Sequence, residues 1–213
     1  MKKLVIFDLD GTLLNTIADL AHSTNYALNK LGYPTHEIEK YNFMVGNGID
    51  KLFERALPEE EKSKENVLRV RKEFVPYYDI HNADDSRPYP GIPELLSYLQ
   101  NAGVQIAVAS NKYQAATQKL VDHYFPEIHF TAVFGQREGV KVKPDPIIVS
   151  EVAKVAKEEV LYVGDSGVDM QTAANAGVTA CGVTWGFRPR TELEEFNPSY
   201  IADTAGEIKK LIL

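Results

Sequence analysis

Two aspartates, Asp8 and Asp10, follow an apolar stretch that begins at Leu4, and Gly11 follows them. A continuous apolar run rich in β-branched residues is typical of a strand buried on both faces of a parallel sheet. Side chains two residues apart on a strand point the same way, so we expect both carboxylates at the carboxyl edge of the sheet. Open α/β sheets bind ligands at that edge, which makes the pair a candidate site. The alternative is that Asp8 caps the following turn while Asp10 is solvated.

Two further polar residues follow later segments of the chain. Ser110 comes after an apolar strand expected over 105–109 and before a helix, so it can cap that helix or help to hold an anion. Lys143 lies in a loop that Pro144 and Pro146 stiffen, whereas most loop lysines are simply solvated. A lysine on a rigid turn can be aimed at a transferring phosphoryl group.

Asp165 and Asp169 follow another expected strand, over 160–163. One interpretation is that they cap the next helix and favour its dipole. The carboxyl ends of parallel strands share one edge, however, and Asp8 and Asp10 would meet them there. Four carboxylates together repel each other unless a cation lies between them. Oxygen ligands alone suit Mg²⁺ better than Zn²⁺, and the histidines and the single cysteine have no ligand-like spacing, so the sequence predicts a Mg²⁺ site.

Strand and helix patterns alternate along most of the chain, which predicts an α/β fold with a doubly wound parallel sheet. Strands are expected over 4–7, 105–109, 130–134, 160–163, 179–183 and 200–202. Helices are expected over 16–31, 49–57, 67–78, 93–102, 113–123, 146–156 and 169–176, and at the end of the chain. The third of these should bend or end near Pro76. The core then comprises residues 1–14 and 84–213, and residues 15–83 form a small helical insertion after the first strand.

The composition excludes several classes of partner. The 213 residues carry a net charge of −7, which argues against a nucleic-acid groove or an anionic membrane surface. No apolar run is long enough to span a bilayer, and the chain begins with a strand rather than a signal peptide. We therefore expect a cytoplasmic protein, as a monomer or a homodimer. Cys181 is the only cysteine, so no internal disulfide can form.

The four candidate motifs, in this order, resemble those of the haloacid dehalogenase superfamily. The matching residues are Asp8-x-Asp10-Gly11-Thr12, Ser110, Lys143 and Gly164-Asp165 with Asp169. The helical insertion resembles the C1 cap of that superfamily, on a Rossmann-like core. Other stretches are similar to the phosphoglycolate phosphatase family: Val45-Gly46-Asn47-Gly48, Arg55-Ala56-Leu57, Tyr89-Pro90-Gly91, Ser110-Asn111-Lys112, Tyr162-Val163-Gly164-Asp165-Ser166 and Gly182-Val183-Thr184-Trp185-Gly186-Phe187.

The resemblance implies a catalytic role for each core motif. Asp8 would be the nucleophile that attacks phosphorus, and Asp10 would protonate the leaving group and then activate water. Ser110 would hold a phosphate oxygen, and Lys143 would offset the charge of carboxylate and phosphate. Members of the superfamily that displace halide lack the second aspartate, so Asp10 points to phosphoryl transfer.

The metal and the substrate would bind beside these groups. The resemblance implies that Mg²⁺ is held by Asp8, the backbone carbonyl of Asp10 and Asp165. Asp169 would bind in the outer shell or pair with Lys143. The expected substrate contacts are Gly11, Thr12, Asn47, Arg55 and Asn111.

Two of those expected contacts, Asn47 and Arg55, lie in the helical insertion, where a purely structural role is the alternative. The backbone N–H groups around Asn47 would face a small acid, and Arg55 would meet its carboxylate. The alternatives are a helix-entry turn for Gly46 and Gly48, and a solvated helix face for Arg55.

The expected function is a Mg²⁺-dependent phosphatase that hydrolyses a small phosphorylated metabolite through an aspartyl-phosphate, with 2-phosphoglycolate as first choice. One alternative is a phosphosugar mutase, although mutases of this superfamily carry a histidine soon after the Asp-Gly turn. Here position 20 is leucine and the nearest histidine is His22. A second alternative is a pyrophosphatase. A non-catalytic binding protein would be expected to lack one of the motif residues, and none is missing.

Overall fold

A computed structural model describes residues 2–155 and 157–212. Within them the chain forms a six-stranded sheet in the order β5-β4-β1-β6-β7-β8, in which every pair of neighbouring strands is parallel. The strands are β1 (Leu4–Phe7), β4 (Gln105–Tyr113), β5 (Ala132–Gln136), β6 (Val160–Gly164), β7 (Thr179–Val183) and β8 (Tyr200–Ala202). The predicted α/β class and doubly wound, Rossmann-like sheet are confirmed.

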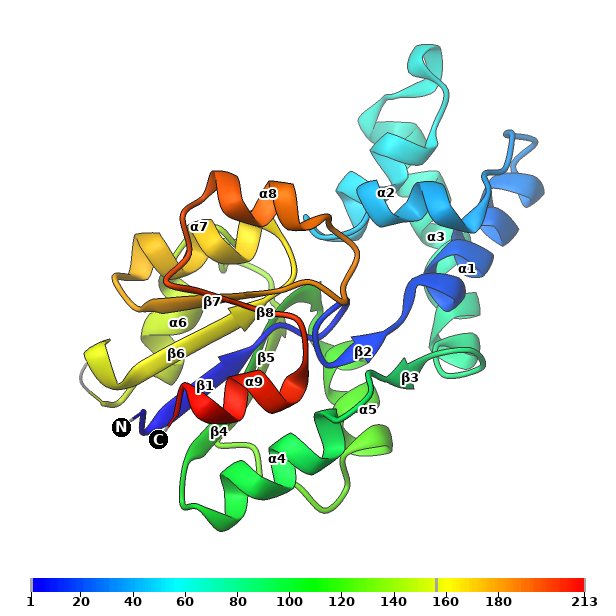
Figure 1. Cartoon of the computed structure of the whole chain (residues 1–213). Helices are drawn as coiled ribbons and strands as arrows, with labels where there is room; N and C mark the ends of the chain where they lie inside the picture. The colour runs from blue at the N-terminus through cyan, green and yellow to red at the C-terminus, as the bar shows by residue number, and fades with distance from the viewer. Residues whose placement is uncertain (1, 156, 213) are drawn as a thin grey trace.

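The central strand β1 is buried along its whole length because helices cover both faces of the sheet (Figure 1). Val5 and Phe7 point to one face, where they pack in a cluster with side chains of α4 (Ile92–Asn101), α5 (Gln114–Tyr124) and α9 (Ala205–Lys210). Leu4 and Ile6 point to the other face. The helices there are α6 (Ile147–Val152), α7 (Gly167–Ala176) and α8 (Arg190–Glu195). This alternation explains why no polar residue interrupts the strand.

The helical insertion has its own apolar cluster, built from α1 (Ile17–Lys30), α2 (Ile49–Ala56) and α3 (Lys64–His81). Figure 1 shows these helices together, beyond the end of β1 from which the chain leaves the sheet. Short 3₁₀ segments lie between them, η1 (Ile38–Phe43) and η2 (Glu59–Glu61). The third helix has Pro76 inside it and continues to His81, so the alternative that it ends near Pro76 is wrong.

Several elements differ from the sequence-based expectations. A short antiparallel pair joins β2 (Leu14–Asn15) to β3 (Arg87–Pro88), where the chain leaves and re-enters the core. Two-residue strands carry no periodic pattern, so they could not be predicted. Helix α8 was not predicted either.

Other elements begin or end at different residues than expected. Strand β5 lies two residues later than the expected 130–134. The helix expected over 146–156 ends at Val152, is followed by η3 (Lys157–Glu159), and its last expected member, Ala156, lies outside the described residues. No helix among the described residues combines the length and the apolar composition that crossing a bilayer requires.

Candidate active site

The carboxyl ends of β1, β4 and β6 open onto one cleft. Its lining combines polar groups from the sheet edge with residues of the helical insertion and of the segment after β7. The lining residues are Asp8, Asp10, Leu20, Val45, Gly46, Gly48, Ile49, Leu52, Ser110, Asn111, Lys112, Asp165, Ser166, Phe187 and Arg188. The structure thus brings together the ends of three neighbouring strands, as parallel pairing requires.

Lys143 reaches the centre of this sheet edge from the loop before α6. Its ammonium lies 3.0 Å from Oδ1 of Asp8 and 2.8 Å from Oδ1 of Asp169, and its side chain is almost completely buried. Burial alone would lower the pKa of Lys143, but the carboxylates of Asp169 and Asp8 outweigh it and raise the pKa well above the usual value. Lys143 is therefore a fixed positive charge beside the expected nucleophile.

Asp8 has an unusual proton affinity. Burial raises its pKa to about 7, with Asp169 and Asp10 adding to the rise while Lys143 opposes it. One carboxylate oxygen also accepts a hydrogen bond from the backbone N–H of Leu9 at 2.7 Å. Burial, with the neighbouring carboxylates, thus outweighs the effect of Lys143 on this carboxyl.

Asp165 lies at the end of β6, where the backbone approaches it unusually closely. Oδ1 accepts a hydrogen bond from Thr12 Oγ1 at 3.1 Å, and Oδ2 accepts one from the N–H of Phe187 at 2.8 Å. A Cβ placed on Gly11 or on Gly186 would come within 2.2 Å of an Asp165 side-chain atom, so neither position admits a larger residue. Gly11 also has φ of +83°, which strains any L side chain. Burial raises the pKa of Asp165 well above its usual value, and Asp169 and Asp8 add to the effect.

Asp169 fulfils both of the roles that the sequence left open. Oδ2 accepts hydrogen bonds from the N–H of Ser166 at 3.1 Å and from Ser166 Oγ at 2.6 Å, which forms a capping box at the start of α7. Oδ1 faces Lys143. Both oxygens therefore have partners in the protein, and the contact with Lys143 is one of the two alternatives expected for Asp169; its place in the outer shell of a metal stays a prediction.

The carboxylates fit a divalent cation. Asp8, Asp165 and Asp169 are buried and each offers one oxygen within 4.8 Å of the others. Burial is the largest cause of the raised pKa values of Asp8 and Asp165, and repulsion between the neighbouring carboxylates, which a cation between them would relieve, adds to it. An all-oxygen set of this kind suits Mg²⁺, whose ligands in proteins are carboxylates and waters. Asp8 and Asp165 are the residues that would hold the ion.

Asp10 is held by two donors on one oxygen. Thr16 Oγ1 donates to Oδ1 at 2.6 Å, and the ammonium of Lys112 lies 3.1 Å from the same atom. Within the described residues, Oδ2 has no hydrogen-bond partner. Lys112 was not among the expected site residues, although it directly follows Ser110 and Asn111 in a stretch that resembles the phosphoglycolate phosphatase family.

Ser110 lies in the cleft but does not cap a helix. Strand β4 continues past it to Tyr113, with a register shift after Ala109, and α5 begins only at Gln114. Its hydroxyl instead accepts a hydrogen bond from the N–H of Lys112 at 3.3 Å. The helix-cap interpretation is wrong because the strand runs on where a helix was expected. The anion-binding role stays a prediction.

Asn111 connects the lysine loop with the helical insertion. Its Oδ1 accepts from the N–H of Lys143 at 2.8 Å, and its Nδ2 donates to the carbonyl of Gly46 at 3.0 Å. A second, longer bond runs from Nδ2 to the carbonyl of Lys143. This places Asn111 at the cleft, as its expected role requires.

The basic residue of the insertion that was expected to meet substrate does not line the cleft. Arg55 is exposed and donates to the carbonyl of Met44 and to Asn47 Oδ1, each at 2.8 Å, so these two expected substrate contacts bind each other. The arginine that lines the cleft is Arg188, in the segment after β7. Position 188 lies just beyond the stretch Gly182–Phe187, which was the only available signal for it.

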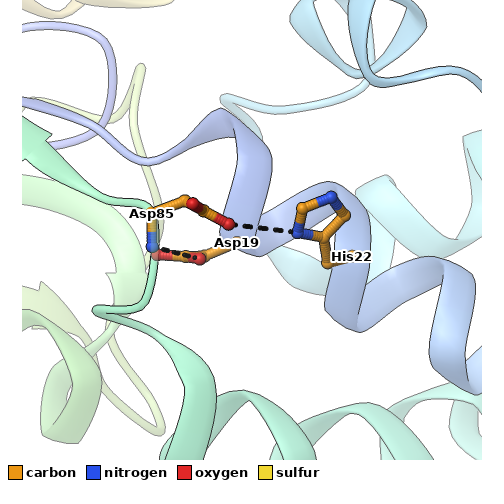
Figure 2. A group of neighbouring side chains, drawn as sticks. All are labelled: Asp19, His22 and Asp85. Carbon is orange, nitrogen blue, oxygen red and sulfur yellow. Dashed lines mark hydrogen bonds and ion pairs between the residues drawn. The ribbon is translucent and has the colours of Figure 1, made fainter.

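No histidine lines the cleft within the part of the chain that the structure describes. Figure 2 shows His22 on α1 with Nδ1 turned toward Asp85 Oδ2, at 3.4 Å, beside Asp19. The oxygens of Asp19 already accept from the N–H groups of Asp85 and Ser86 and from Ser86 Oγ. This group ties the start of the insertion to the returning chain.

Comparison with known proteins identifies the family of this chain. The profile of haloacid dehalogenase-like hydrolases matches residues 5–183. A phosphoglycolate phosphatase from Vibrio parahaemolyticus is 32% identical over 218 aligned residues, which cover 99% of this chain and 96% of the relative. One from Mesorhizobium japonicum is 33% identical over 94% of this chain and 90% of its own length.

A solved structure matches the fold of this chain over its whole length. The crystal structure of a protein from Lactobacillus delbrueckii subsp. bulgaricus matches with a TM-score of 0.93 and 34% identity, covering 100% of this chain and 99% of its own. With its motif aspartates gathered at one cleft of a parallel sheet, the chain belongs to the haloacid dehalogenase-like hydrolases and, among these enzymes, to the phosphoglycolate phosphatase family.

Proposed function

We propose that this enzyme is a Mg²⁺-dependent phosphatase that hydrolyses small phosphomonoesters through an aspartyl-phosphate on Asp8, and that 2-phosphoglycolate is its substrate. The observation that carries the proposal is the arrangement at the sheet edge. Asp8 and Asp10 line one cleft, and the buried ammonium of Lys143 lies 3.0 Å from Asp8. A nucleophile, an acid–base group and a fixed positive charge are the parts that phosphoryl transfer needs.

In the first step a carboxylate oxygen of Asp8 bonds to phosphorus while the bond from phosphorus to the ester oxygen breaks. Asp10 gives its proton to the departing oxygen, which therefore leaves as a neutral hydroxyl group and not as an alkoxide. Lys143 offsets part of the charge on the transferred group, and Ser110 holds one of its oxygens. Asp8 must be ionised to attack phosphorus. The ammonium of Lys143 beside it favours the ionised form.

In the second step water attacks the phosphorus of the aspartyl-phosphate, and the bond from phosphorus to the Asp8 oxygen breaks. Asp10, now a carboxylate, takes a proton from that water. The products are inorganic phosphate and free Asp8. Bound at Asp8 and Asp165, Mg²⁺ would supply positive charge that screens the nucleophile from the phosphate dianion.

The choice of 2-phosphoglycolate rests on the relatives and on the charges of the cleft. The relatives from Vibrio and Mesorhizobium are named phosphoglycolate phosphatases. Lys112 and Arg188 also line the cleft, so an acidic leaving group would meet positive charge there. A mutase is disfavoured because no histidine of the described residues lines the cleft, and His22 faces Asp85 instead.

The helical insertion would act as a cap that selects the leaving group and excludes water. It contributes Leu20, Val45, Gly46, Gly48, Ile49 and Leu52 to the cleft lining. Water at the phosphorus would compete with Asp8, so a lid over the sheet edge favours the covalent route. The division of the chain at residues 15–83, the cytoplasmic location and the monomeric or homodimeric state stay predictions.

The test is phosphate release from 2-phosphoglycolate, glucose 1-phosphate, 4-nitrophenyl phosphate and pyrophosphate, each with Mg²⁺ and with EDTA. We expect selective release from 2-phosphoglycolate, lost with EDTA and lost in Asp8→Asn. Faster release from pyrophosphate would replace the substrate while keeping the chemistry. Release that survives in Asp8→Asn would overturn the nucleophile, and no release from any ester would overturn the proposal.

A further inference from the structure

Lys112 is a buried cation in the cleft that has no part in the two bond-breaking steps described above. Its ammonium lies 3.1 Å from Asp10 Oδ1 and 4.8 Å from the centre of the Tyr78 ring, and its side chain is 2% exposed. The lysine comes from β4, Asp10 follows β1, and Tyr78 belongs to α3 of the helical insertion. A charge with so little access to water is stabilised by the groups that touch it, here a carboxylate and a ring face.

The Tyr78 ring is itself held in place against the core. The next residue, Asp79, accepts a hydrogen bond from the Tyr113 hydroxyl at 2.5 Å, and the Lys119 ammonium donates to the Asp79 carbonyl. The ring also stacks on Phe74, with centroids 5.0 Å apart. The Tyr78 hydroxyl is buried and has no hydrogen-bond partner within the described residues, so the ring face is what Tyr78 offers to Lys112.

We propose that Lys112 is a positioning residue for Asp10, which acts through that carboxylate and not on the phosphoryl group. Together with Thr16 Oγ1 at 2.6 Å, the ammonium fixes Oδ1 and leaves Oδ2 free to meet the ester oxygen. The ammonium also stabilises the charge that develops on Asp10 as its proton moves to the leaving group. This inference rests on the proposed function, because it takes Asp10 as the acid of the first step.

If Lys112 positions Asp10, its loss should matter most for an ester whose leaving group needs a proton. A phenolate is a poor leaving group and needs a proton from Asp10, whereas 4-nitrophenolate is a stable anion and departs with little help. Phenyl phosphate and 4-nitrophenyl phosphate are nearly the same shape and neither carries a carboxylate. For both esters kcat/KM reports the step in which the leaving group departs. A loss of Asp10 positioning therefore lowers kcat/KM for phenyl phosphate far more than for 4-nitrophenyl phosphate.

The experiment measures both kcat/KM values with Mg²⁺ in the wild type, Lys112→Met and Lys112→Arg. General acid catalysis contributes about 10²–10⁴-fold, so Lys112→Met should lower the phenyl phosphate value about 100-fold and the other value by less than about fivefold. Lys112→Arg keeps the charge and should recover much of the phenyl phosphate value. Equal losses for the two esters in Lys112→Met would overturn the proposal and leave the proposed function intact.

Lys30→Met is the matched control. Lys30 also pairs with a carboxylate, Glu73 at 2.6 Å, and lies over a ring, that of Tyr26, but on an exposed face of the insertion. The Lys30→Met variant should leave the ratio of the two kcat/KM values unchanged. If Lys112→Met does not fold, Tyr78→Leu carries the test, because it removes the ring face. An unchanged ratio of the two kcat/KM values in that variant would overturn the proposal. A wild type that releases phosphate from no ester, 2-phosphoglycolate included, would overturn both proposals together.

Discussion

The guanidinium of Arg188 donates a hydrogen bond to the backbone carbonyl of Val45 at 3.0 Å, which joins the segment after β7 to the loop before α2. The same side chain donates to the carbonyls of Asn42 and Phe43. Its Nε lies 3.4 Å from Glu192, so the guanidinium is held on the core side as well. Arg188 therefore holds the end of the 3₁₀ segment η1 over the cleft, and three carbonyls of the insertion depend on one residue of the core.

Arg188→Ala should weaken substrate binding by releasing this loop. Hydrogen bonds that involve a charged group contribute about 1.5–3 kcal/mol each, so even one net bond corresponds to roughly a tenfold rise in KM. Steady-state kinetics on the preferred ester measures it, with limited proteolysis within residues 38–48 as a second readout. Arg55→Ala is the matched control, since both bonds of Arg55 stay within the insertion, and it should raise KM less. A larger rise in KM for Arg55→Ala than for Arg188→Ala would contradict the conclusion that Arg188 holds this loop over the cleft.

The sequence was sufficient to predict the parts of the site that repeat a regular pattern. Asp8 and Asp165 follow apolar strands that neighbour each other in the sheet, so parallel pairing alone brings them together. Arg188 could not be predicted, because it follows a strand by several residues and reaches the cleft only through the course of a loop. The Lys112 contact depends on a strand that continues past Ser110 and on a ring from α3. Both are tertiary contacts between segments far apart in the chain.

Lys143→Met should destabilise the metal-free protein strongly. Methionine fills a similar volume but leaves the buried carboxylates of Asp8 and Asp169 without their cation, and breaking a buried ion pair costs about 3–5 kcal/mol. Denaturant unfolding in EDTA measures the loss, and Mg²⁺ should recover part of it by supplying charge at Asp8. Lys141→Met removes an 81% exposed lysine of the same loop and should change little. Similar stability of the two variants in EDTA would contradict the ion-pair account.

Cys181 should resist thiol reagents while the protein is folded. It lies in β7 without exposure to solvent, and burial raises the pKa of its thiol to about 12, so the thiolate is scarce at neutral pH. A disulfide reagent at pH 8 should therefore label the native protein only as fast as the protein opens, and label it at once in denaturant. Immediate labelling of one thiol in the native protein would place Cys181 at the surface and contradict the fold at β7.

The stability of the metal-free enzyme should fall as pH rises from about 4 to about 7. The pKa of Asp8 is raised from 3.8 to about 7 in the folded state, so over this window the folded protein retains a proton that the unfolded chain has released. The unfolded state then binds fewer protons than the folded one, and the free energy of unfolding decreases with pH. Asp165, whose pKa is also raised, adds to the same slope.

Denaturant unfolding in EDTA at pH 5, 6, 7 and 8 measures this slope, and two comparisons assign it. Asp8→Asn removes the titrating carboxyl and should be less sensitive to pH than the wild type over the same range. Saturating Mg²⁺ should flatten or reverse the wild-type slope, because the ion binds the ionised carboxylates and so favours the folded state where protons have left. A wild-type stability in EDTA that rises from pH 5 to pH 7 by as much as that of Asp8→Asn would mean that Asp8 already carries a charge at pH 5. Lys143 alone would then be enough to hold the carboxylates together, and the electrostatic need for a metal at this edge of the sheet would disappear.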